Sequence, residues 1–113
     1  MKFSKIFNET KKNSKLDKKN NLGIAGHLCK AAEELGELAQ SINKLIGRKK
    51  IKENESKEQI KDNILEESAD LIQCVIAILS SKELDFTAEQ LKQKLFDKNL
   101  DYKEFINSKN LKN

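Results

Sequence analysis

Two long segments of the chain repeat apolar residues every three or four positions, and the sequence contains no proline to interrupt them. The first segment runs from about residue 22 to residue 46, and the second from about residue 57 to residue 81. This spacing places the apolar side chains on one side of an α-helix. The sequence therefore predicts an all-α fold, a small helical bundle with two long central antiparallel helices.

Acidic residues interrupt both apolar segments. Glu34 and Glu37 lie three positions apart in the first, and Glu67 and Asp70 in the second. Residues with this spacing share one face of a helix, so each pair points in one direction. If the helices pair, the carboxylates converge, and burying them without partners would cost several kcal/mol each. Mg²⁺ takes oxygen ligands and would remove this cost.

The remaining segments complete a single domain. Residues 1–20 are expected to form an N-terminal helix followed by a basic connector, and residues 108–113 a frayed tail. Residues 21–107 form the helical domain. Gly47 is a natural stop for the first long helix. Thr87, three residues before a glutamine, predicts a capping box at the start of the last helix.

Gly36 lies inside a predicted helix, where glycine costs about 1 kcal/mol relative to alanine. Two explanations stay open: the close approach of another backbone or a ligand, and a tight crossing of two helices.

The segment from residue 57 to residue 81 is apolar on more than one face. In so small a protein, the additional apolar side most simply meets another subunit. The bundle is therefore expected to be completed by dimerisation, with a homodimer or a tetramer as the assembly.

Composition limits the environment and the partners. The net charge of +4 suits an anionic ligand, but no base-reading motif is present, which disfavours nucleic acid as the partner. The longest apolar run, residues 71–79, is too short to span a membrane, and the N-terminus lacks an apolar signal segment. Cys29 and Cys74 are expected to be buried free thiols. These features predict a cytoplasmic protein.

The acidic motifs resemble those of a known family. Glu-Glu-Leu-Gly-Glu-Leu at 33–38 and Glu-Glu-Ser-Ala-Asp-Leu at 66–71 are similar to the paired E-x-x-E and E-x-x-D motifs of the MazG family of all-α nucleoside triphosphate pyrophosphohydrolases. The resemblance covers residues 22–106. It implies Mg²⁺-dependent hydrolysis of a (deoxy)nucleoside triphosphate to the monophosphate and pyrophosphate, with Mn²⁺ as a substitute ion. It also assigns the catalytic and metal-binding roles to Glu34, Glu37, Glu67 and Asp70.

Other residues are candidates for binding the rest of the nucleotide. The sequence has no glycine-rich phosphate loop, so cations near the acidic motifs would neutralise the phosphates. The phosphate candidates near these motifs are Lys44, Arg48 and Lys49, and His27 is a candidate for contacting the base. The resemblance implies two further candidates, Lys98 for the phosphates and Asn99 for the base. The basic segment at 47–57 has a second interpretation, that of a solvated surface loop.

The alternative function is a catalytically degenerate helical dimer that acts as a nucleotide-binding or assembly module. In that case the acidic pairs would be surface charge. If the acids are only surface charge in an assembly module, addition of Mg²⁺ with nucleotide would leave the melting temperature unchanged.

Overall fold

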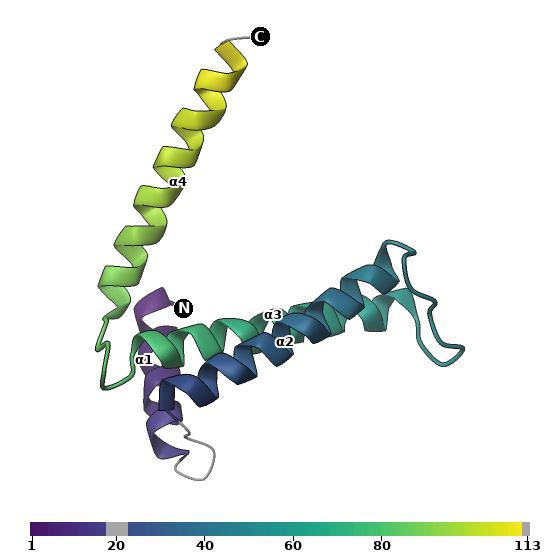
Figure 1. Ribbon diagram of the computed structural model, residues 1–113, viewed down its shortest axis with the longest axis horizontal. Helices are drawn as coiled ribbons and strands as arrows, with labels where there is room; N and C mark the ends of the chain where they lie inside the picture. The colour runs from purple at the N-terminus through teal and green to yellow at the C-terminus, as the bar shows by residue number, and fades with distance from the viewer. Residues whose placement is uncertain (18–22, 112–113) are drawn as a thin grey trace.

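The computed structural model describes residues 1–17 and 23–111, which form four helices (Figure 1). These are α1 (Phe3–Leu16), α2 (Gly23–Leu45), α3 (Lys57–Leu79) and α4 (Ala88–Leu111). No β-strand occurs among these described residues. The predicted all-α fold is confirmed.

Helices α2 and α3 form the central antiparallel hairpin (Figure 1). Both ends of the connecting loop are fixed by local hydrogen bonds. After α2, Gly47 adopts a φ of 81°, and the backbone N–H of Arg48 donates to the carbonyl oxygen of Asn43 at 2.8 Å. This is a Schellman-type end, and it confirms Gly47 as the helix stop. Before α3, Ser56 and Gln59 form a reciprocal capping box.

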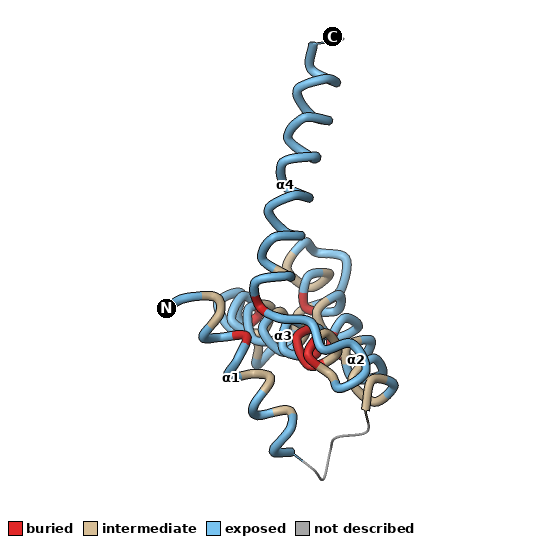
Figure 2. The backbone as a smooth tube through the Cα atoms, turned by 90° about the vertical axis from the view of Figure 1, so that its left-hand side faces the viewer, coloured by how far each residue is buried: buried red, intermediate tan, exposed pale blue. Residues whose placement is uncertain are grey.

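Helix α1 crosses one end of the hairpin and supplies the centre of a small core. Phe7 is fully buried and packs with Ile76 of α3 and Ala88 of α4. Figure 2 shows how few backbone positions are buried elsewhere. The predicted basic connector is partly wrong, because α1 continues as a helix to Leu16 and includes its first lysines. The rest of that predicted connector, residues 18–20, lies outside the described residues.

Helix α4 begins as predicted but extends away from the other helices (Figure 1). The backbone N–H of Thr87 donates to Oε1 of Gln90 at 2.9 Å, and the N–H of Gln90 donates back to Oγ1 of Thr87 at 3.2 Å. This confirms the capping box. The helix continues through Leu111, beyond the point at which fraying was expected. In the described part of the chain, Ala88 is its one buried residue.

Gly36 lies on an open part of α2. A Cβ atom at this position would meet no atom of the described residues within 4 Å. A tight crossing with another helix of the same chain is therefore the wrong explanation for this glycine. The approach of a ligand or of another chain stays a prediction.

None of the four described helices combines the length and the apolar character needed to cross a lipid bilayer.

Candidate functional site

The hairpin brings the two acidic motifs to the same region. Glu34 of α2 and Asp70 of α3 line one open pocket of about 390 Å³, and residues of α1 line it as well. Glu67 lies one turn before Asp70 on α3 and contacts α2 at Ser41. Of the four predicted acids, Glu34 and Asp70 thus share this pocket, whereas Glu37 and Glu67 do not line it. Convergence of all four on one ion stays a prediction.

Glu34 is the most buried of the four acids, with 4% of its surface exposed. Its Oε1 atom forms an ion pair with the Nζ atom of Lys30, one turn earlier on α2, at 3.3 Å. Its Oε2 atom is buried and has no hydrogen-bond partner among the described residues. A carboxylate oxygen in this state is costly unless a donor or a cation reaches it.

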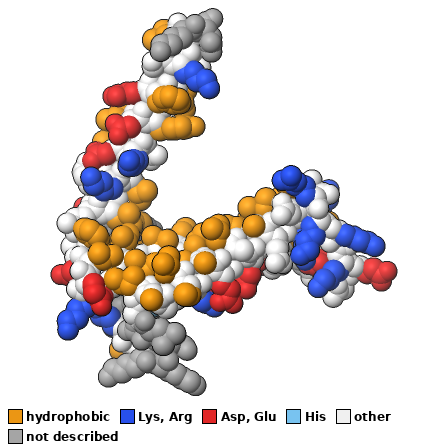
Figure 3. Space-filling view, in the orientation of Figure 1, with side chains coloured by type: hydrophobic (Ala, Val, Ile, Leu, Met, Phe, Trp, Pro, Cys, Tyr) orange, Lys and Arg blue, Asp and Glu red, His pale blue; other side chains and the backbone are white. Residues whose placement is uncertain are grey.

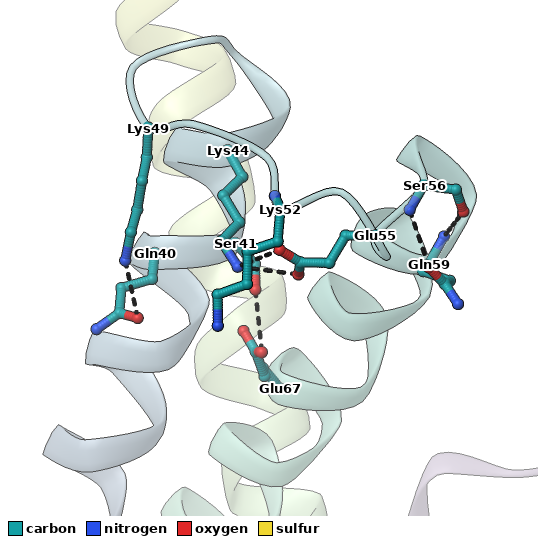
Figure 4. Close-up of polar contacts among 9 residues, drawn as sticks. All are labelled: Gln40, Ser41, Lys44, Lys49, Lys52, Glu55, Ser56, Gln59 and Glu67. Atoms are coloured by element: carbon teal, nitrogen blue, oxygen red, sulfur yellow. Dashed lines mark hydrogen bonds and ion pairs between the residues drawn. The ribbon is translucent and has the colours of Figure 1, made fainter.

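Glu67 shows the same division between its two oxygens. Oε1 accepts a hydrogen bond of 3.0 Å from the hydroxyl of Ser41, which is itself buried (Figure 4). Oε2 is buried and, within the part of the chain that the structure describes, unpaired. Neighbouring helices therefore each hold one buried carboxylate oxygen that lacks a donor.

Glu37 links these two acids electrostatically. The negative charge of Glu34 is the largest cause of a raised pKa at the exposed Glu37 carboxyl, and loss of solvation beside α2 adds to it. The charges of Glu33 and Glu67 raise this pKa further, whereas Lys30 opposes them. The cluster is therefore rich in negative charge and incompletely neutralised by its own lysine.

The carboxylate oxygens of this cluster suit a divalent cation by their chemistry, but they are not arranged as a coordination shell. Across residues 1–17 and 23–111, no three His, Cys, Asp or Glu side chains are grouped so that they could hold one metal ion. The two unpaired oxygens of Glu34 and Glu67 are nevertheless the hard, charged ligands that Mg²⁺ prefers. Metal binding would therefore require side-chain rotation within the cluster.

The pocket beside Glu34 contains several groups that sequence reasoning missed. Polar side chains of α1, including Thr10 and Asn13, face Gln73 and Cys74 of α3 across it. No motif pointed to α1, because its role depends on how it crosses the hairpin. His27 also lines this pocket, as its predicted role in binding the base requires.

The two cysteines differ from one another. Cys74 is buried as predicted, and burial raises the pKa of its thiol, with the nearby charge of Glu34 as the next cause. The prediction for Cys29 is wrong, because this residue is exposed.

Of the predicted phosphate-binding cations, Lys44 and Lys49 lie at the end of the hairpin where the loop joins α2 and α3 (Figure 4). Lys44 is half-buried and forms an ion pair with Glu55 at 2.9 Å. Lys49 is exposed and donates a long hydrogen bond of 3.4 Å to Gln40. Arg48 is exposed at the start of the loop. Lys44 is thus paired with an acid of the loop, whereas Arg48 and Lys49 are exposed to solvent.

Lys98 and Asn99 are not brought to the acidic cluster of their own chain. Both are exposed on α4, which contacts the described remainder of the molecule through its first turns. Any contact of these two residues with a nucleotide bound at Glu34 would have to involve another copy of the chain.

Comparison of the chain with protein-family models, with curated proteins and with solved structures found no match.

Proposed function

We propose that the protein hydrolyses a (deoxy)nucleoside triphosphate to the monophosphate and pyrophosphate in a Mg²⁺-dependent reaction. The observation that carries this proposal is the pair of buried, donor-free oxygens on Glu34 and Glu67, held by neighbouring helices beside Glu37. Retaining such an arrangement is expensive unless a cation completes it. The resemblance of both acidic motifs to those of the MazG family supports the same function.

The four acids would act together as cation ligands. Glu34 and Glu67 would offer their free oxygens, and Glu37 and Asp70 would turn toward the same ion. When bound, Mg²⁺ would supply positive charge against the phosphate oxygens. Glu37 or Glu34 would orient the attacking water and accept its proton.

The nucleoside would occupy the pocket between α1 and the hairpin. Its volume of about 390 Å³ falls within the range of small-molecule sites. His27 would contact the base there. Arg48 and Lys49, at the loop end of α2, would attract the phosphates. The protein would act as a homodimer or a tetramer, with a nucleotide rather than nucleic acid as its partner.

Pyrophosphate release from a panel of NTPs and dNTPs, with Mg²⁺ and with Mn²⁺, tests this function. Glu37→Gln and Asp70→Asn should abolish release while the helical circular dichroism is retained. Glu66→Gln is the matched control, since Glu66 is an exposed neighbouring acid outside the predicted set. Full activity in both site variants would overturn the proposed site.

A degenerate relative that binds nucleotide without hydrolysing it is the second candidate. It is favoured by the absence, among the described side chains, of a group already arranged to hold a metal. This candidate predicts a nucleotide-induced rise in melting temperature without pyrophosphate release. A pure assembly module would show neither effect.

A further inference from the structure

The chain exposes far more surface than a compact protein of its size. Its accessible area is 9146 Å², whereas a compact monomer of 12.9 kDa exposes about 6,300 Å². Its radius of gyration is 17.6 Å, against about 13 Å for a compact domain. The excess of about 2,800 Å² exceeds one partner's share of an ordinary obligate interface, about 1,000–2,500 Å².

Much of this surface is apolar and follows a seven-residue spacing on both helices of the hairpin. The residues concerned are Leu28, Leu35 and Ile42 on α2, and Leu65, Ile72 and Leu79 on α3. All except the half-buried Leu79 are exposed large hydrophobics, up to 70% for Leu65. Such a spacing is typical of helices that pack along their whole length against other helices.

Helix α4 carries the same signal. Ala88, Leu95 and Tyr102 are spaced by seven residues, and Leu95 and Tyr102 are 51% and 64% exposed. The opposite face of this helix carries Asp97 and Asp101 together with the exposed Leu100. Figure 3 shows hydrophobic side chains along α4 on the side of its angle with the hairpin, and along the hairpin edge that faces the same angle.

We propose that a second copy of this chain occupies the angle between α4 and the hairpin. The two hairpins would pack through their apolar faces, and the α4 of each chain would lie across its partner. The helices match in length, with 23, 23 and 24 residues, or about 35 Å each. With a two-fold axis between the copies, each chain would cover the apolar hairpin face and the apolar α4 face of its partner. The same surfaces would then meet on both chains, as an isologous interface requires.

The apolar character of both surfaces favours a second copy of the chain as the occupant, because each surface can then cover the other. Both surfaces are apolar, so packing one against the other buries no acidic or basic group from either stripe. By helical position, the stripe on α2 lies to one side of the buried Glu34, and Glu33 and Glu37 lie to the other. This surface is therefore distinct from the acidic cluster. The apolar surface would form the contact between subunits in the assembly that the proposed function includes. This contact does not depend on hydrolysis.

Sedimentation velocity of the full chain over a range of concentrations tests the proposal. The wild type should have a dimeric mass, or that of a tetramer built from dimers. Ile72→Lys and Tyr102→Lys should each weaken assembly by at least about tenfold. Glu66→Lys on α3 and Asp101→Lys on α4 are controls, since both residues are exposed, lie off the stripes and change the charge by more than the stripe variants do.

Hydrogen exchange of the wild type keeps the test decisive if a variant fails to fold. The amides of α4 should be protected when the protein is concentrated and should lose protection on dilution. A monomeric wild type with rapidly exchanging α4 amides would overturn the proposal, as would unchanged assembly in both stripe variants. Neither result bears on pyrophosphate release, so the two proposals fail separately.

Discussion

The hydroxyl of Ser41 on α2 donates a 3.0 Å hydrogen bond to Oε1 of Glu67 on α3. This contact joins the two helices at the acidic cluster and fixes one oxygen of Glu67. The other oxygen is buried without a donor from the described residues. Ser41 thus positions a predicted metal ligand, although its own side chain carries no charge.

Replacing Ser41 should reveal how much this positioning contributes. Ser41→Ala would leave both oxygens of a partly buried carboxylate without this donor, at a cost of about 1–3 kcal/mol in the free energy of unfolding. Denaturant unfolding measures the loss. Ser68→Ala is the control, because the Ser68 hydroxyl donates to the carbonyl oxygen of Ile64 in its own helix. Equal stability of the two variants would show that the contact is unimportant.

Glu37 should make the metal-free protein less stable as pH rises. Its pKa is raised above the ordinary value of 4.5, chiefly by Glu34, so the folded state favours the protonated form. That stability is present at low pH and is lost as pH rises through the raised pKa. Without metal, Glu37→Gln should therefore melt higher than the wild type near neutral pH, and the difference should shrink on acidification.

Addition of Mg²⁺ should reverse the order of the Glu37 comparison, because a bound cation stabilises the charged carboxylate. Thermal melts with and without Mg²⁺ across this pH range measure both effects. Glu66→Gln again serves as the control. A wild type that outmelts Glu37→Gln at neutral pH in the absence of metal would contradict the assigned repulsion.

Glu55 should show the opposite dependence on pH. Its pKa is lowered below 4.5, first by the hydrogen bond from Lys44 and then by the backbone N–H of Lys52. This stability is present above the ordinary pKa and is lost as pH falls through the lowered value. Glu55→Gln should therefore destabilise the hairpin loop at neutral pH and converge on the wild type in acid. Exchange rates of the amides of residues 47–56 measure the change, and identical rates at neutral pH would contradict it.

The sequence was most informative where local rules decide the structure. The two long helices were predictable because apolar periodicity and the absence of proline act within each segment. The shared faces of the acidic pairs followed from the three-residue spacing. The capping box at Thr87 and the stop at Gly47 also depend on nearby backbone groups, and both predictions are confirmed.

What the sequence could not predict depends on contacts between helices. Ser41 and Lys30 have no motif, and their roles follow from the hairpin register and from burial of Glu34. The exposure of Cys29 depends on which side of α2 meets α3. The direction of α4 is set by the turn before it, where Asp85 adopts a φ of 49°. That turn carries Lys98 and Asn99 away from the acids.

Gly36 offers a test of what approaches the open side of α2. Because a Cβ there meets no atom of the described chain within 4 Å, Gly36→Ala should stabilise the fold by about 1 kcal/mol through helix propensity. Gly47→Ala is the contrasting variant, since the φ of 81° at Gly47 makes a side chain unfavourable by about 1 kcal/mol. Chemical denaturation of both variants measures whether each substitution raises or lowers the free energy of unfolding. If Gly36→Ala instead loses stability, nucleotide affinity or assembly, another chain or a ligand must approach this position, and the lost property identifies which.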